Sequence, residues 1–215
     1  MVDSEMVTYL LVTPAKNEER HLPKVAEAVI GQTVLPVLWV IVDDGSTDGT
    51  PGIIEKFERQ FNWIRSIRLP PHPRDITFHY SYVCKRGFDH ALEFCKINDI
   101  RYNFIGLLDA DTVLEKAYFE KLSVEFNKNS LLGIASGHIT DMPDGEVRWA
   151  DIKKDESDRP LPRGSGRLWR KECFFETGEY LIEPAPDSIS NVKAILRGWE
   201  TRQFGHIKAI QLRDT

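Results

Sequence analysis

The arrangement of apolar segments in the first 130 residues constrains the fold of this chain more than any other feature. Four short segments have the length and side-chain types of β-strands, at 6–12, 37–42, 64–69 and 102–108. The segments that alternate with them repeat apolar residues at helical spacing, at 18–32, 50–60, 87–97 and 116–127. This β-α alternation predicts a parallel sheet with helices on both faces. We expect Thr50 to be the N-cap of its helix, because Pro51 suits the first helical position.

The second half of the chain has a different pattern. Residues 141–163 are polar and charged without a regular period, and short helices are expected at 171–174 and 188–197. Strands are expected at 132–137 and 203–212. With 215 residues, 41% of them hydrophobic, the chain can bury one sizeable core. We therefore expect a single domain that spans residues 1–215.

Composition and charge limit the partners and the location of the protein. The formal net charge is −5, and no block of Lys and Arg offers a local site for nucleic acid, so nucleic acid is not an expected partner. Cys84, Cys95 and Cys173 are scattered, which predicts buried free thiols in a reducing compartment. The sequence has no signal-peptide features and no apolar run of roughly 20 residues. We expect a cytoplasmic protein, and peripheral contact with a membrane stays open, through the acceptor or through a further C-terminal segment.

Polar residues follow three of the expected strands, at the edge where parallel strands end. They are Thr13-Pro14, Asp43-Asp44 and Asp109-Ala110-Asp111. Ligands of open α/β sheets bind just beyond these carboxyl ends. Carboxylates gathered there would repel a diphosphate, so we expect a divalent cation, Mn²⁺ or Mg²⁺, whose preferred ligands are hard oxygens. The period of an extended segment turns Asp109 and Asp111 to the same side, although a D-x-D sequence taken alone is more often a solvated turn.

Three motifs occur in an order that is typical of one enzyme family. They read VTPAKNEE at residues 12–19, VIVDDGSTDGT at residues 40–50 and LLDADT at residues 107–112. Over about residues 7–205 the chain resembles the inverting family-2 glycosyltransferases, which have the GT-A fold. The resemblance implies a mostly parallel central sheet flanked by helices, with a Rossmann-like nucleotide-sugar-binding half at about 1–130 and an acceptor and catalytic half at about 131–215. It also implies a metal-dependent, hexosyltransferase-like reaction that moves a sugar, with inversion, from a nucleotide-diphosphate donor to an acceptor hydroxyl.

The resemblance places the donor nucleoside against the ends of the first two strands. The pocket would be lined by Thr13, Pro14, Ala15, Asn17 and Glu18, with Glu18 facing the ribose or the base. Asp43 would accept a hydrogen bond from a base N–H, which favours UDP as the nucleotide. Asp44 would support the site or only form the turn, since Asp-Gly is a turn sequence.

The resemblance gives different roles to the two carboxylates of the third motif. Asp111 would bind the metal directly, and Asp109 would lie near the ribose and the metal, with Ala110 between them at the donor. Lys85 or Arg86, at an expected helix start, would counter the phosphate charge. Alternatively, each of these two residues is only a solvated cation at the start of a helix.

Inversion also requires a base that accepts the proton of the attacking hydroxyl. Family members often carry this carboxylate in a Glu-Asp pair that opens a helix, after a region that residues 166–172 match. At this place residues 184–188 read PAPDS, so Asp187 is the expected base and Glu183 is the reserve candidate. Asp187 could instead only cap the helix. This departure from the family pattern keeps open a non-catalytic module that binds nucleotide sugars.

Other nucleotide-binding classes fit the sequence less well. A Rossmann dehydrogenase needs G-x-G-x-x-G and a P-loop NTPase needs G-x-x-x-x-G-K-[ST], and the sequence contains neither. A sugar nucleotidyltransferase would share the sheet and a metal-binding aspartate, but it would usually open with a Gly-rich basic loop that this chain lacks.

Four aromatic residues are weaker candidates. Trp169 and Trp199 could stack on a sugar, although a Trp is more often part of the core. His138 and His206 lie near expected strand ends, where a structural role is expected before a metal-ligand role. The sequence does not identify the transferred sugar, nor whether the acceptor is a sugar, a protein or a lipid.

Overall fold

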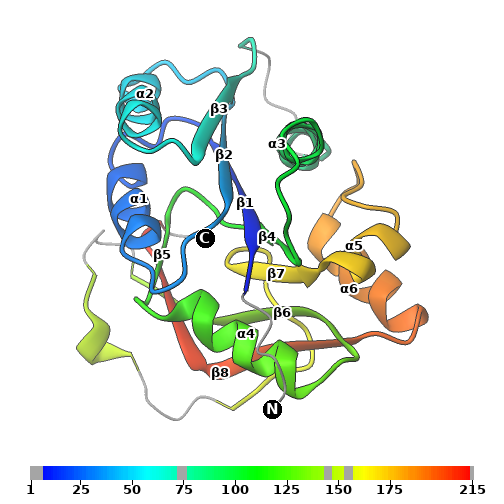
Figure 1. Cartoon of the computed structure of the whole chain (residues 1–215). Helices are drawn as coiled ribbons and strands as arrows, with labels where there is room; N and C mark the ends of the chain where they lie inside the picture. The colour runs from blue at the N-terminus through cyan, green and yellow to red at the C-terminus, as the bar shows by residue number, and fades with distance from the viewer. Residues whose placement is uncertain (1–6, 72–76, 143–146, 153–156, 214–215) are drawn as a thin grey trace.

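The computed structural model describes residues 7–71, 77–142, 147–152 and 157–213 (Figure 1). The first half contains β1 (Tyr9–Ala15), α1 (Leu22–Ile30), β2 (Leu38–Asp43), α2 (Thr50–Gln60), β3 (Ile64–Arg68), α3 (His79–Ile97) and β4 (Phe104–Leu107). The second half contains β5 (Thr112–Leu114), α4 (Tyr118–Lys128), β6 (Leu132–Asp141), the 3₁₀ helix η1 (Trp149–Asp151), β7 (Arg167–Arg170), α5 (Lys171–Glu176), α6 (Pro186–Leu196) and β8 (Glu200–Gln211).

These strands form one sheet in the order β3-β2-β1-β4-β7-β6-β8-β5. The first four pair in parallel, with Leu10 of β1 opposite Leu38 of β2 on one side and Ile105 of β4 on the other. Beyond β4 the pairing is mixed, because β7 runs antiparallel to β4 and β6, β8 runs parallel to β6, and β5 runs antiparallel to β8. The predicted α/β class is confirmed. The parallel pairing brings the carboxyl ends of β1, β2 and β4 to one edge.

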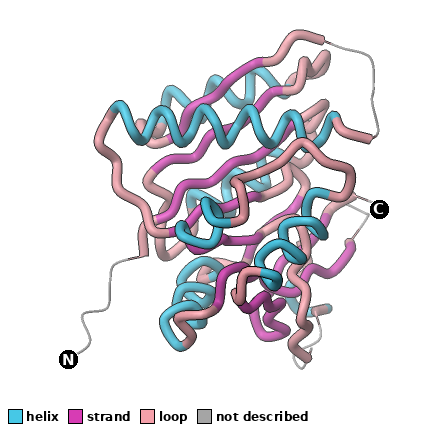
Figure 2. The backbone as a smooth tube through the Cα atoms, turned by 90° about the vertical axis from the view of Figure 1, so that its right-hand side faces the viewer, coloured by secondary structure: helices cyan, strands magenta, loops and turns pink. Residues whose placement is uncertain are grey.

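The core has two layers because side chains alternate along the central strands. Tyr9 and Leu11 of β1 pack into one cluster with the helices α1, α2 and α4, and Leu10 and Val12 pack into the other with α3, α5 and α6. Figure 2 looks onto the second layer, where the long α3 crosses in front of the strands. Because the central strands are covered on both faces, they are apolar almost throughout, as parallel strands of this kind usually are.

Helix α3 begins at His79, eight residues before the predicted start at residue 87. Its buried stripe continues toward the N-terminus through Cys84 and Ser81, whose small or polar side chains hid the helical period. The placement of Lys85 and Arg86 at a helix start is therefore wrong, and both lie inside the helix. At Gly87 α3 packs tightly on the sheet, since a β-carbon there would be 2.5 Å from the Val12 side chain and 2.7 Å from the Val42 side chain.

Two strands of the second half were not predicted. β5 begins at Thr112, directly after the acidic motif, and β7 begins at Arg167, directly after a Gly-Ser-Gly turn. Both are short, so they offer too few residues for a recognisable period. β6 is longer than predicted and runs through Asp141, and η1 follows within the stretch that was expected to be irregular. Residues 143–146 and 153–156 of that stretch lie outside the described residues.

The start of α2 also differs from the prediction. Gly49, rather than Thr50, is the N-cap, and Thr50 is the first helical residue. The Thr50 hydroxyl oxygen accepts a hydrogen bond from the Glu18 N–H at 2.7 Å, which joins α2 to the segment after β1.

Two predictions from composition can be compared with the structure. Cys84, Cys95 and Cys173 are buried free thiols, as expected. None of the helices within the described ranges is long and apolar enough to cross a membrane.

Candidate active site

A cleft of about 680 Å³ lies at the carboxyl ends of β1, β2 and β4. The predicted site residues that line it are Pro14, Ala15, Asn17, Glu18, Asp44, Asp109, Ala110 and Asp111. The cleft is completed by Lys16, His79, Tyr80, Val83, Gln211 and Arg213. Three of the predicted motifs therefore meet in one cavity, as the strand-end argument requires.

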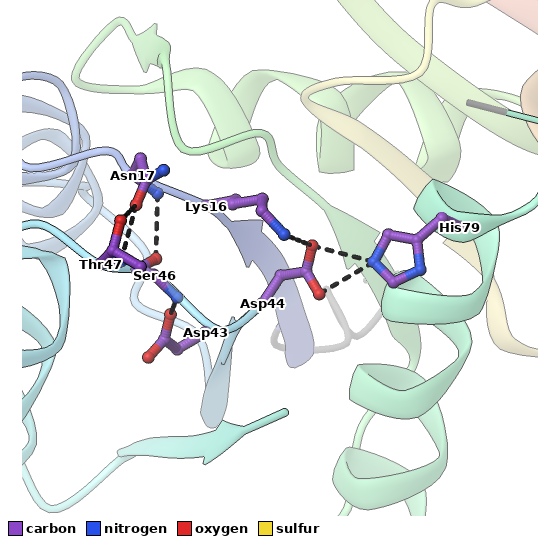
Figure 3. Close-up of polar contacts among 7 residues, drawn as sticks. All are labelled: Lys16, Asn17, Asp43, Asp44, Ser46, Thr47 and His79. Carbon is purple, nitrogen blue, oxygen red and sulfur yellow. Dashed lines mark hydrogen bonds and ion pairs between the residues drawn. The ribbon is translucent and has the colours of Figure 1, made fainter. Parts of the chain in front are cut away.

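The second motif contributes Asp44, which is held between two basic side chains (Figure 3). Its carboxylate lies 3.2 Å from Lys16 Nζ and 2.9 Å from His79 Nε2. Asp44 is almost fully buried. The sequence left open whether Asp44 supports the site or only forms a turn; the structure places its carboxylate in the cleft wall with charge-assisted partners.

Asp43 and Thr13 lie behind the cleft rather than in its lining. Figure 3 shows the Asp43 carboxylate pointing away from that of Asp44. It accepts a hydrogen bond from the Ser46 N–H at 2.9 Å, and its other oxygen lies 3.1 Å from Arg68 Nε. Thr13 is fully buried, and its hydroxyl accepts a hydrogen bond from Trp39 Nε1 at 2.9 Å. In this structure both side chains stabilise the strand ends from inside.

Asn17 joins the first motif to the second. Its side-chain oxygen accepts a hydrogen bond from the Thr47 N–H at 2.9 Å, and its own N–H donates to the Ser46 hydroxyl at 3.0 Å. Its φ is +55°, a left-handed conformation that Asn adopts more readily than most residues. The turn after β1 is thus fixed against the turn after β2.

The third motif contributes two carboxylates with different surroundings. The Tyr80 hydroxyl donates to Asp109 Oδ1 at 2.7 Å, and the Asp109 N–H donates to the Ser165 hydroxyl at 2.9 Å. Burial raises the pKa of Asp109 to about 7; repulsion from Asp111 and Asp187 acts in the same direction, and the Tyr80 hydrogen bond opposes it. The ionised form of Asp109 is therefore disfavoured mainly by burial and further by the two neighbouring carboxylates.

Asp111 and Glu18 share a cation from the last residues of the chain. Arg213 donates a hydrogen bond from Nη2 to the Glu18 carboxylate, and its Nε lies 4.0 Å from Asp111 Oδ2. The Glu18 carboxylate also lies 3.0 Å from His21 Nδ1. Burial raises the pKa of Glu18, and the charge of Asp111 adds to that effect, while His21 and Arg213 lower it.

Asp187 lies in the first turn of α6, and its charge acts on the same acidic edge. Asp187 is not among the residues that line the cleft, but its charge contributes to the raised pKa values of Asp109 and Tyr80. Arg167, fully buried, has its Nη1 atom 3.8 Å from Asp187 Oδ1. Gly164 packs directly against the carboxylate, since a β-carbon there would be 2.0 Å from Asp187 Oδ2.

Arg167 is held in place by backbone carbonyls. Its Nε donates to Arg163 O at 2.8 Å and its Nη2 donates to Pro162 O at 2.9 Å. Its guanidinium also lies over the Trp169 ring, 5.0 Å from the centroid. A buried guanidinium with several acceptors is a fixed charge, so Arg167 fixes the position of Asp187 relative to the loop before β7.

The basic pair Lys85 and Arg86 does not line the cleft. Lys85 bonds to Asp89 one turn further along α3 and lies 3.8 Å from Glu179 Oε2. Arg86 is exposed on the same helix. Neither residue lines the cleft with Asp109 and Asp111.

The remaining candidates also lie apart from the cleft lining. Trp169 is 1% exposed and packs against Phe88 and Tyr180, which confirms the core interpretation. Trp199 donates from Nε1 to Glu176 at 2.9 Å, and the exposed His206 lies 3.6 Å from Glu125. The reserve base Glu183, like His138, is absent from the lining. Among the described residues, no group of three or more His, Cys, Asp or Glu is arranged to hold a metal ion by itself.

Sequence reasoning missed Tyr80, His79 and Arg213 as cleft residues. The first two lie in the first turn of α3, which was expected to begin further along the chain. A helix start at residue 79 would have placed both at the strand-end edge. Arg213 follows β8, and local patterns do not reveal which strand β8 joins.

Comparison with known proteins identifies the family. The family model described as Glycosyl transferase family 2 matches residues 10–182. A 4,4'-diaponeurosporenoate glycosyltransferase of Staphylococcus aureus is 27% identical over 134 residues, which are 60% of this chain and 32% of that relative. The chain thus spans about a third of the length of the curated relatives it matches.

Solved structures share the fold at low sequence identity. S. aureus TarS 1-349 has a TM-score of 0.70 and 15% sequence identity, and the match covers 96% of this chain and 60% of that chain. For its complex with UDP-GlcNAc the TM-score is 0.66 and the identity 15%, and the match covers 97% of this chain and 60% of that chain. The mannosyltransferase PcManGT from Pyrobaculum calidifontis, in complex with GDP-Man and Mn²⁺, has a TM-score of 0.64 at 16% identity, over 94% and 56%. The predicted GT-A fold is confirmed by these neighbours, and the family match covers most of the chain: the chain belongs to glycosyl transferase family 2.

Proposed function

We propose that this chain transfers a sugar, with inversion, from a nucleoside-diphosphate donor to an acceptor hydroxyl. The observation that carries the proposal is the cleft at the strand ends, where Asp109 and Asp111 line the same cavity as the residues after β1. Ligands of parallel α/β sheets bind at this edge. The family match and the nucleotide sugars named for two of the solved neighbours support the same conclusion.

The residues of the acidic edge fit a divalent cation. Asp109 and Asp111 supply the hard oxygen ligands that Mg²⁺ and Mn²⁺ prefer, and such ions are usually held by one or two carboxylates together with substrate phosphates and water. Burial and, to a lesser extent, the charges of Asp111 and Asp187 raise the pKa of Asp109, so a cation bound at this edge would stabilise its ionised carboxylate. In the proposal Asp111 and Asp109 hold the ion, which would neutralise the donor diphosphate when bound.

Asp187 is the proposed base. The acceptor oxygen would attack the anomeric carbon from the side opposite the diphosphate, and the bond from that carbon to the diphosphate oxygen would break. The nucleoside diphosphate would leave with the electron pair, and the proton of the acceptor hydroxyl would pass to the Asp187 carboxylate. Support comes from the effect of Asp187 on the pKa of Asp109 and from its fixation by Arg167.

UDP is the proposed nucleotide, with GDP as the alternative. Solved TarS complexes contain UDP-GlcNAc and UDP, whereas the PcManGT complex contains GDP-Man. Asp43, the residue expected to accept from the base, has one oxygen bonded to the Ser46 N–H. To reach the base, its other oxygen would have to turn from Arg68.

A thermal-shift series with UDP, GDP, CDP and dTDP, each with and without Mn²⁺, tests the donor site. A ligand at 100 times its dissociation constant stabilises a protein by about 2.7 kcal/mol. We expect UDP with Mn²⁺ to give the largest shift and Asp111→Ala to abolish the part that depends on Mn²⁺. Asp141→Ala, at the exposed end of β6, is the matched control. Equal shifts with and without Mn²⁺ would contradict the metal, and no shift with any nucleotide would contradict the donor site.

A nucleotide-sugar-binding module without catalysis is the second candidate, because proline replaces the glutamate of the usual Glu-Asp pair. Release of nucleoside diphosphate from a nucleotide sugar, in the presence of acceptor, distinguishes the two. Binding without such release, over a panel of sugar, protein and lipid acceptors, would favour the module.

A further inference from the structure

Arg213 lies on the acidic edge because the chain around it is bonded to that edge. Gln211 at the end of β8 pairs with Thr112 of β5, directly after Asp111. The Leu212 N–H then donates to the backbone carbonyl of Asp111 at 2.9 Å. Figure 1 shows β8 running beside β5, with which it pairs in antiparallel orientation. The residue after Leu212 is therefore held next to Asp111.

The side chain of Arg213 turns into the cleft and bonds to the carboxylates. Its guanidinium donates to Glu18, and its Nε lies 4.0 Å from Asp111 Oδ2. The two carboxylates are nearly buried, with side-chain exposures of 8% and 10%, whereas Arg213 is 49% exposed. A half-exposed, long side chain can leave such a position without unfolding its surroundings.

The other basic side chains that line the cleft contact a different carboxylate. Lys16 and His79 both contact Asp44, which follows β2. The guanidinium of Arg213 thus supplies compensating charge to Glu18 and to Asp111, and Asp111 is also a proposed ligand of the divalent cation.

We propose that Arg213 competes with the divalent cation for Asp111, so that the guanidinium must leave Asp111 and Glu18 before the ion binds. This inference rests on the proposed role of Asp111 as a metal ligand. A guanidinium and a divalent ion at the same carboxylate repel each other. The two occupants are therefore linked: removing one raises the affinity for the other, typically by about 5- to 150-fold for coupled sites.

The test is Mn²⁺ binding without nucleotide, measured from the electron paramagnetic resonance signal of free Mn²⁺. We expect Arg213→Gln to bind Mn²⁺ about tenfold more tightly than the wild-type chain. Arg202→Gln is the matched control, because Arg202 is also a half-exposed arginine, lies on β8, and contacts Asp158 rather than the cleft. This control should keep the wild-type affinity. Thermal unfolding of each variant checks that it is folded.

The outcomes separate this inference from the proposed function. If wild-type and Arg213→Gln chains bind Mn²⁺ equally, or the variant binds it more weakly, the competition is refuted while the metal site stands. If neither binds Mn²⁺ without nucleotide, the competition is refuted, and the metal site is decided separately by the thermal-shift series with nucleotide. If only the variant binds it, the competition is supported in its strongest form. A gain that persists in the Asp111→Ala, Arg213→Gln double variant would refute Asp111 as the shared ligand.

Discussion

The carboxylates at the two ends of the cleft have different surroundings. At the end formed by β1 and β2, Asp43 lies against Arg68 and Asp44 lies between Lys16 and His79. At the end formed by β4 and the loop before β7, burial raises the pKa of Asp109, whose carboxylate accepts a hydrogen bond from the Tyr80 hydroxyl and has no ion pair among the described residues. A carboxylate with a cationic partner stabilises its ionised form, whereas one without it favours binding of a proton or a metal ion. The comparison indicates a structural end and a chemically active end.

The largest expected effect comes from removing the proposed base at the active end. Asp187→Asn keeps the shape of the side chain but cannot accept the acceptor proton, so turnover should fall about 10²- to 10⁴-fold. Affinity for the nucleoside diphosphate should stay near the wild-type value. Initial rates and nucleotide titrations measure the two quantities. Glu183→Gln is the control, and full activity of Asp187→Asn would move the base elsewhere.

Removing the cation that fixes Asp187 should destabilise the fold. Arg167→Met leaves Asp187 without its buried partner and several carbonyls without their donor, which should lower the free energy of unfolding by about 3 kcal/mol. Urea unfolding measures this change. Arg163→Met, at an exposed position in the same loop, should stay within about 0.5 kcal/mol of wild type. Equal stabilities of the two variants would contradict the role of Arg167.

The structural end should respond mainly through stability. Asp44→Asn weakens the contacts to Lys16 and His79, so we expect a loss of about 2 kcal/mol in the free energy of unfolding. Asp99→Asn is a suitable control, because Asp99 is exposed and its φ of +51° suits Asn equally well. A loss of Mn²⁺ binding in Asp44→Asn, with unchanged stability, would reverse the assignment of the two ends.

The smallest effect is a pH dependence that distinguishes the ends. The pKa of Asp109 is about 7 in the folded chain, above its usual value near 4, so the folded state holds this proton more tightly than the unfolded state. The resulting stability is fully present below pH 4 and is lost as the pH rises through 7. Asp109→Asn should therefore gain stability relative to wild type as the pH rises from 4 to 8.

Urea unfolding of both chains at the two pH values gives this difference. Asp44→Asn should not show a relative gain at high pH, since its carboxylate has cationic partners. If the free energies of unfolding of Asp109→Asn and wild type changed in parallel with pH, the pKa of Asp109 would not be raised by folding. The contrast between Asp109 and Asp44 would then be contradicted.

The sequence predicted part of the structural end and the acidic motif of the active end. The apolar runs before Pro14 and Asp43 define their strands, and parallel strands end at a common edge. Those residues could therefore be placed together without coordinates. The same reasoning placed Asp109 and Asp111 at that edge.

The rest depends on contacts between distant segments. Tyr80 was missed because the buried stripe of α3 includes Ser81 and Cys84, which do not read as an apolar period. Arg213 reaches Glu18 through the pairing of β8 with β5, a choice of neighbour that local sequence does not encode. Asp187 was proposed from the family pattern, but its fixation by Arg167 and Gly164 required the packed structure.

The close packing of Gly87 on Val12 and Val42 has a consequence for movement in the cleft. It leaves α3 little clearance above β1 and β2, so we expect the first turn of that helix, with His79 and Tyr80, to stay in place over the sheet. The opposite wall includes Arg213, a half-exposed residue at the end of β8. When a ligand enters, the width of the cleft is therefore expected to change on the β8 side.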